Sequence, residues 1–359
     1  MVRQFVLALL VMIAASATAQ KLQTVDKDGQ PVPYVSVISE DGDIIGTTGL
    51  DGVLDNLKGA EVVSVTHVAY KSKKVKVGQG GRVVLEDADF DLPEIAVTNK
   101  PLVYVQTYYR VIYLNDDPND KLCYYRAGLL NNSFDRKTKK LSVDEDHLSA
   151  SSSGIFKTAL NLIIGAYIKQ IAGLKMVKVE SRMKRKYQEL GITFLPEGPG
   201  RQLINDNYGI VGVITDNQAN SERRYSYDTH LLRKHQIQTT GSEKKKAKAE
   251  KKEAQQKNRT DQDFTVYHID DQGNYFPEDL VMHQLATSYD EGEKGDKHVN
   301  ILFQVFTTDR ACVTKDELKQ TKKANKMKMT YQNIQEFERV NNIHPLPEEL
   351  SARLKEIVK

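Results

Sequence analysis

Residues 20–92 constrain the fold most strongly, because short runs of β-forming residues alternate there with glycine, proline and Asp-Gly pairs. Asp41-Gly42 is typical of a tight hairpin turn between two strands. Val75 and Val77 alternate with lysines, which predicts a strand that keeps one face in water. About seventy residues with so many short strands predict a small all-β sandwich built from two sheets.

Three segments of this stretch carry a family resemblance. They read Gly29-Gln-Pro-Val-Pro-Tyr-Val-Ser-Val37, Gly46-Thr-Thr-Gly-Leu-Asp-Gly52 and Glu61-Val-Val-Ser-Val-Thr-His-Val-Ala-Tyr70. In this order they resemble the carboxypeptidase-regulatory-like domain, and with the closing segment Leu92 to Thr98 the resemblance covers residues 20–98. It implies a transthyretin-like β-sandwich in a protein of the Gram-negative cell envelope, and it implies nothing about activity.

The N-terminus predicts a secretion signal over residues 1–19. Arg3 supplies a positive charge, and the run from Phe5 to Ala15 is apolar but too short to span a membrane comfortably. Small residues precede Gln20, so we expect cleavage between Ala19 and Gln20. The mature chain is then expected in the periplasm or at the outer membrane, without a transmembrane segment.

The composition excludes nucleic acid as an expected partner. The chain has 359 residues and a formal net charge of only +3, which is too small for a nucleic-acid-binding surface. With 40% hydrophobic and 28% charged residues, it is typical of a globular protein.

Residues 93–101 predict a linker to a second domain, which covers residues 102–359. Val103–Leu114 and Leu122–Leu130 predict an antiparallel strand pair, and the apolar positions of residues 155–171 recur at helical spacing. A strand with alternating apolar residues is expected near residue 300, and a helix is expected at the C-terminus. This order predicts an α+β domain with a mainly antiparallel sheet, as in periplasmic lipid and lipoprotein carriers, where a curved sheet wraps around a helix.

A charged stretch interrupts the second domain at residues 243–259. It consists almost entirely of lysine, glutamate, alanine and glutamine, without an apolar stripe. It is therefore expected to form either a flexible insertion or a solvated helix. Contact with anionic phosphates of the envelope is a further option for its lysines.

Six tyrosines lie in the two predicted strands and suggest two alternatives. They form an exposed platform for a sugar or peptide, with Tyr104, Tyr108 and Tyr124 as candidate binding residues, or they lie half-buried with the hydroxyl at the rim. The absence of tryptophan weakens the sugar alternative. The six are Tyr104, Tyr108, Tyr109, Tyr113, Tyr124 and Tyr125.

Cys123 and Cys312 are the two cysteines of the chain. In an oxidising compartment they are able to pair and close a long loop, and the alternative is two separate buried thiols. Neither cysteine has a histidine or another cysteine at metal-ligand spacing, so no metal site is expected.

A search for catalytic motifs finds none. No His-Glu-x-x-His, Gly-x-Ser-x-Gly or phosphate-binding glycine loop occurs, and none of the eight histidines has a glutamate three residues later. His67 is expected to be a partly buried histidine with satisfied hydrogen bonds. No catalytic residue and no cofactor is therefore predicted.

Two functions remain after this search. The favoured one is a non-catalytic envelope protein, in which the sandwich is a docking or spacer module and the α+β domain binds a protein, glycan or lipid. The alternative is an envelope hydrolase of peptides or glycans whose site is scattered over the α+β domain. Two carboxylates or a His–Asp pair in a deep cleft would favour the hydrolase.

Overall fold

The computed structural model describes residues 21–358 except 78–80, 96–97, 117–121, 139, 172–188 and 292–296. The predicted signal and its cleavage point at Ala19 and Gln20 lie outside the described residues. No helix in the described ranges is both long enough and apolar enough to cross a membrane. The fold is mostly β and contains several sheets with antiparallel pairing, as expected.

The first seven strands form two small sheets, and we call residues 21–92 the N-terminal unit. The predicted hairpin turn is confirmed, because Gly42 has a φ of +78°, a value that glycine adopts without strain. Buried side chains from both sheets belong to one hydrophobic core. One sheet contains β1 (Leu22–Val25), β4 (Val53–Leu54) and β7 (Gly81–Val84), and the other contains β2 (Ser36–Ile38), β3 (Ile44–Thr47), β5 (Val62–His67) and β6 (Tyr70–Lys76).

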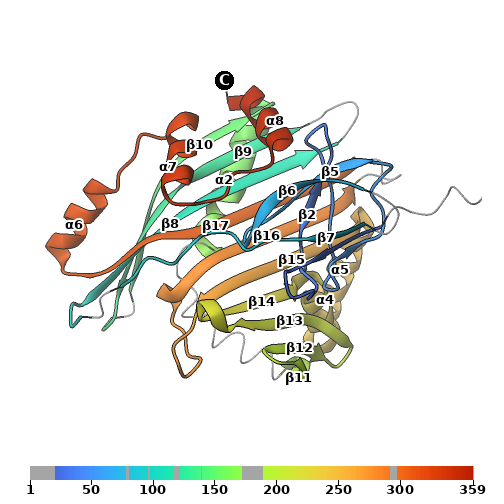
Figure 1. Cartoon of the computed structure of the whole chain (residues 1–359), viewed down its shortest axis with the longest axis horizontal. Coiled ribbons are helices and arrows are strands. Elements are labelled where there is room, and N and C mark those ends of the chain that lie inside the picture. The colour runs from blue at the N-terminus through green and yellow to red at the C-terminus, as the bar shows by residue number, and fades with distance from the viewer. Residues whose placement is uncertain are drawn as a thin grey trace, which may run out of the picture.

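A large ten-stranded antiparallel sheet crosses the molecule (Figure 1). The antiparallel pair predicted for residues 103–114 and 122–130 is confirmed, because β8 and β9 are antiparallel neighbours close to one edge of this sheet. In spatial order the strands are β10 (Leu141–Ser151), β9 (Cys123–Asp135), β8 (Leu102–Asn115), β17 (Lys297–Val313), β16 (Leu280–Glu291), β15 (Gln256–His268), β14 (Glu222–Asp228), β13 (Gly209–Asn217), β12 (Arg201–Asp206) and β11 (Thr193–Gly198).

The helices confirm the two helical patterns of the sequence. The apolar stripe of residues 155–171 lies in α2 (Gly154–Ile171), and the C-terminal stripe lies in α8 (Glu348–Val358), where Leu350 and Leu354 are fully buried. The other helices that lie in the described residues are α4 (Thr229–Thr240), α5 (Glu243–Gln255), α6 (Lys315–Ala324) and α7 (Tyr331–Val340), with single 3₁₀ turns at η1 (Gln218–Asn220) and η2 (Pro277–Asp279).

The charged stretch forms a solvated helix rather than a flexible insertion. Residues 243–255 make α5, which has no buried residue. Strand β15 already begins at Gln256, so the last four residues of the predicted insertion belong to the sheet. Lysine, glutamate and alanine are strong helix formers, which explains a helix without an apolar stripe.

The two faces of the large sheet are covered by different parts of the chain. Because side chains alternate along a strand, Arg110 lies on one face of β8, and Tyr109 and Val111 lie on the other. The front face, which bears Arg110, is covered by the N-terminal unit and by α7 and α8. The back face packs against α2, through Ile164 and Ile168, and against α4 and α5 (Figure 1).

A row of polar side chains attaches the N-terminal unit to the front face. Arg110 donates from Nε to Gln304 (2.7 Å), and Gln304 donates to Gln284 (2.7 Å). Gln284 donates to the carbonyl of Tyr34 (3.0 Å) and accepts from the amide of Val68 (3.1 Å). Such a fully connected buried network fixes the N-terminal unit in one position.

The strand expected near residue 300 is confirmed as β17, but the polar side chains that alternate with its apolar ones do not face water. Gln304 is fully buried, and Asn300 donates to the carbonyl of Ile44 (3.0 Å). These polar residues alternate with apolar ones as they would on an exposed strand. Here they instead form hydrogen bonds with, or toward, the N-terminal unit that covers this face of the sheet.

The predicted disulfide alternative is wrong, and the two cysteines are separate buried thiols. In the strand register Cys123 pairs with Leu114, and Cys312 pairs with Val103, eleven positions away on the same strand. At about 3.4 Å per residue this separates them by about 37 Å, far beyond the roughly 7 Å that a disulfide tolerates between Cα atoms.

We expect both thiols to be unreactive in the native protein and to react fully after denaturation. Burial raises the pKa of Cys123 to about 12, so little thiolate is present at neutral pH. Thiol titration with a chromogenic disulfide reagent, with and without urea, measures this directly. A urea unfolding midpoint that shifts on addition of reductant would contradict the assignment.

Candidate functional site

The tyrosines that the sequence offered as an exposed platform are buried in the sheet. Tyr104, Tyr108 and Tyr124 are each fully buried. Their hydroxyl groups donate to Asn131 (2.6 Å), Glu338 (2.7 Å) and Asn161 (2.7 Å) in that order. Both faces of the sheet are covered, so alternate tyrosines on either face meet a packed layer instead of water. The three candidates therefore form no binding surface.

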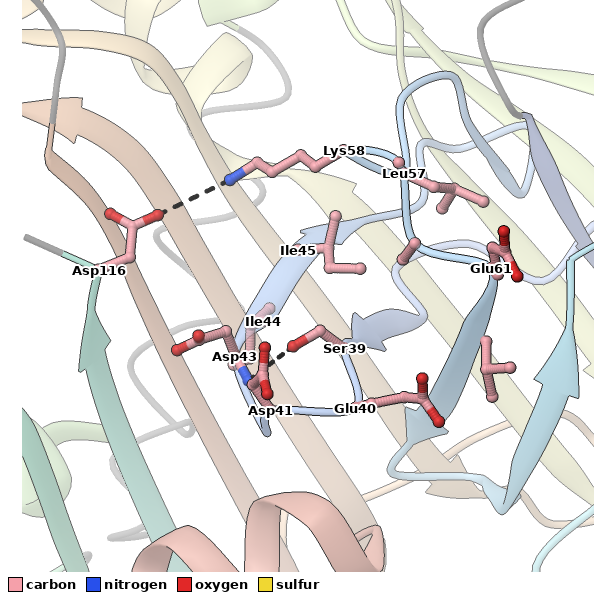
Figure 2. Close-up of a pocket in the computed structure, with 13 residues that line it drawn as sticks. Ser39, Glu40, Asp41, Asp43, Ile44, Ile45, Leu57, Lys58, Glu61 and Asp116 are labelled. Carbon is pink, nitrogen blue, oxygen red and sulfur yellow. Dashed lines mark hydrogen bonds and ion pairs between the residues drawn. The ribbon is translucent and has the colours of Figure 1, made fainter. Parts of the chain in front are cut away.

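A cavity of about 490 Å³ lies between the N-terminal unit and the end of β8 (Figure 2). This volume falls in the range of small-ligand sites, which often lie between two units of a protein. Its lining comes from two segments of the N-terminal unit and from one residue that directly follows β8. The lining residues are Ser39, Glu40, Asp41, Asp43, Ile44, Ile45, Leu57, Lys58, Gly59, Ala60, Glu61, Val62 and Asp116.

One wall of the cavity is the hairpin that joins β2 to β3. Its turn closes through bonds from the amide of Gly42 to the carbonyl of Ser39 (3.0 Å) and from the amide of Ser39 to the carbonyl of Asp43 (2.8 Å). A Cβ atom on Gly42 would lie 2.7 Å from the carbonyl oxygen of Glu349, so only glycine lets α8 approach the turn. The Arg353 guanidinium of α8 also contacts Asp43.

The opposite wall is the loop from Leu57 to Val62. Leu57 is fully buried and anchors the loop, while Lys58 (φ +51°) and Gly59 (φ +82°) turn the backbone in the left-handed region. This turn directs the Lys58 side chain across the cavity toward Asp116, with 3.9 Å between Nζ and Oδ2 (Figure 2). Both side chains are more than one-third exposed, so the pair contributes little to stability.

Negative charge is in excess around the cavity. Five carboxylates and one ammonium group line it. Asp43 contacts Arg353, and Asp116 accepts from the amide of His298 (2.6 Å). In the described part of the chain, Asp41 and Glu61 form no ion pair. Clustered carboxylates in a partly enclosed space attract cationic groups, so the cavity suits a lysine, an arginine or an amine.

The lining residues provide no recognisable catalytic group. None of them is a histidine or a cysteine, and the single hydroxyl, Ser39 Oγ, accepts a hydrogen bond from the amide of Asp43 (3.2 Å). A serine without an adjacent base is a weak nucleophile. A carboxylic general acid needs a desolvated site, whereas the side chain of Glu40 is 62% exposed.

Histidine–aspartate pairs occur elsewhere in the described residues, but none lines the cavity. Their partners lie between 8 and 31 positions apart, so no local motif marks them. The pairs are His235–Asp206 (2.6 Å), His298–Asp290 (2.6 Å), His283–Asp263 (3.0 Å) and His230–Asp261 (3.8 Å).

His67 differs from its prediction, because it is fully buried and only half satisfied. Its Nδ1 accepts from the amide of Ala69 (3.2 Å), and its Nε2 has no hydrogen-bond partner among the described residues. Within the described ranges, no group of three or more histidine, cysteine, aspartate or glutamate side chains is arranged to hold a metal ion.

Sequence reasoning missed the cavity carboxylates. Asp41 was recognised only as part of a turn, and Asp116 follows β8 by one residue, 75 positions further along the chain. An unusual density of acidic residues around the first hairpin was the one available signal. A scan against protein-family models finds no match, and a search of curated proteins finds no relative of this chain.

Proposed function

We propose that this protein is a non-catalytic protein of the cell envelope that uses the acidic cavity to bind a cationic group of a protein partner. The observation that carries this proposal is the pair Asp41 and Glu61, two carboxylates that form no ion pair among the described residues, in a cavity that no histidine or cysteine lines. Of the expected partners, a protein that presents lysine or arginine fits this lining better than an anionic lipid or a neutral glycan.

We further propose that residues 20–92 are a carboxypeptidase-regulatory-like domain with a transthyretin-like sandwich, followed by an α+β domain. The seven short strands and the two small sheets support this proposal. Of the two expected roles, docking module or spacer, we favour docking, because the N-terminal unit shares a core with the large sheet and supplies most of the cavity wall.

The proposal predicts that Asp41→Asn with Glu61→Gln weakens partner capture about tenfold or more, because each lost ion pair removes roughly fivefold in affinity. Asn-Gly favours a tight hairpin turn as strongly as Asp-Gly does, so the hairpin between β2 and β3 should be unchanged in this variant. The bait is the mature chain from Gln20, incubated with cell-envelope extract. Binding of a short lysine-rich peptide, followed by calorimetry, provides a defined probe.

The matched control is Glu250→Gln with Asp271→Asn, which removes two exposed carboxylates away from the cavity. Equal loss in both variants would show a net-charge effect and overturn the cavity assignment. Recovery of the native protein in the cytoplasmic fraction would overturn the export part of the proposal.

The alternative function is an envelope hydrolase, and one observation favours it. The carboxylate of Asp206 is fully buried and lies 2.6 Å from Nδ1 of His235, the arrangement that orients an imidazole as a general base. Turnover of peptides or glycans that disappears in His235→Asn would support this function. If the native protein turns over neither peptides nor glycans, the hydrolase function is rejected.

A further inference from the structure

Helix α5 is the most strongly charged exposed element in the described residues. It follows α4 on the back face of the large sheet and has no buried residue. Its sequence, Glu-Lys-Lys-Lys-Ala-Lys-Ala-Glu-Lys-Lys-Glu-Ala-Gln, contains no aromatic or large apolar side chain. Neither the cavity nor the core explains why this helix is so basic.

The charges of α5 are sorted by face. With about 100° of rotation per residue, five lysines fall within an arc of about 120°, while the glutamates fall on the other side of the helix. We call these five side chains the lysine face. They are Lys244, Lys245, Lys248, Lys251 and Lys252, and the glutamates are Glu243, Glu250 and Glu253.

The glutamate side of α5 is the side that interacts with the rest of the protein. Glu253 forms an ion pair with Lys234 of α4 (2.7 Å), whereas Glu243 pairs within α5 itself, with Lys246 (3.1 Å). No ion pair occurs for the lysine face in the part of the chain that the structure describes. Partial burial lowers the pKa of Lys252, and the positive charges of Arg259 and Arg233 lower it further. The electrostatic potential around Lys252 is therefore positive.

We propose that the lysine face of α5 binds the phosphate groups of an anionic membrane surface. The lysine face extends for about 12 Å along the helix axis, which matches a row of headgroups better than a single small ligand. Without aromatic or apolar side chains it has nothing to stack on a base or to insert into a protein groove, so the contact is electrostatic. This inference does not depend on the cavity.

Flotation with lipid vesicles tests the proposal. The mature chain should bind vesicles that contain 30% phosphatidylglycerol and should not bind pure phosphatidylcholine, and binding should disappear at high salt. Lys244→Gln, Lys248→Gln and Lys251→Gln together should weaken binding about a hundredfold, since each lysine near an anionic surface contributes about fivefold. Glutamine is also a good helix former, so the helical circular dichroism should be unchanged.

The matched control removes three exposed lysines from α6, namely Lys315, Lys319 and Lys323. This control has the same net charge and should bind within about fivefold of the unchanged protein. Equal loss in both variants, or no loss in the α5 variant, would overturn the proposal. Displacement from vesicles by inorganic phosphate at constant ionic strength would show a free-anion site and would also overturn it.

Discussion

Replacing Glu338 by alanine should lower the free energy of unfolding by about 3–5 kcal/mol, because it leaves a buried guanidinium without its partner. Arg110 is 1% exposed, and its Nη1 lies 2.9 Å from Oε1 of Glu338. The same carboxylate oxygen accepts from the hydroxyl of Tyr108 (2.7 Å), so the substitution removes two hydrogen bonds. Urea unfolding followed by circular dichroism measures the change.

Glu336 provides a control on the same helix. It pairs with Arg339 one turn away, and both side chains are more than half exposed. Glu336→Ala should therefore change stability little, because water screens the pair. Replacing both Arg110 and Glu338 by apolar residues should recover part of the loss, since no charge is then buried alone. Equal effects of the two glutamate substitutions would contradict the buried ion pair.

Acidification from pH 7.5 to pH 5 should destabilise the protein by roughly 2 kcal/mol through the buried His344, and protonation of the buried His67 should act in the same direction. Burial lowers the pKa of both imidazoles, and the pKa of His344 falls to about 3. An unfolded histidine has a pKa near 6.5. The unfolded chain thus binds more protons below that pH, so this stability is complete above pH 6.5 and is lost as the pH falls toward 3.

The surroundings of the two rings explain why their protonation is costly. His67 lies against Phe264, with 4.4 Å between ring centroids, and His344 lies 6.1 Å from Phe306. After burial, the largest electrostatic effect on each ring comes from a positive charge, namely Arg224 for His67 and Arg110 for His344. A second positive charge in either place is repelled and cannot be hydrated.

A histidine variant separates this effect from the titration of carboxylates. Urea unfolding at pH 7.5 and pH 5 should show a pH difference that is about 2 kcal/mol smaller in His344→Leu. His268 is exposed, so His268→Leu should keep the full difference. The same pH difference in the unchanged protein and in both variants would rule out His344 as the cause.

The sequence predicted what depends on local spacing. The helix at residues 155–171, the turn at Gly42 and the antiparallel pair β8–β9 are all set by residues close together in the chain. The sequence did not predict which alternating polar residues are buried. Arg110 and Gln304 look like solvent-facing residues until the N-terminal unit and α7 cover them, and no local pattern encodes that cover.

The candidate site was unpredictable for the same reason. Asp41 and Asp116 line one cavity because the N-terminal unit docks on the large sheet. That docking depends on hydrogen bonds between distant segments, such as the one between Gln284 and Tyr34, 250 residues apart. The prediction of an exposed tyrosine platform was wrong because an alternating strand has a solvent-exposed face only when one face of its sheet is left uncovered.

The position of β17 has a consequence for how the chain folds. This strand lies between β8 and β16, so it joins one half-sheet, β8–β10, to another, β11–β16. It is also the last strand along the chain. During synthesis both half-sheets therefore keep an unpaired inner edge until residues 297–313 are available, and neither can complete its core alone. Folding of the ten-stranded sheet therefore waits until β17 has been synthesised and can pair with both half-sheets.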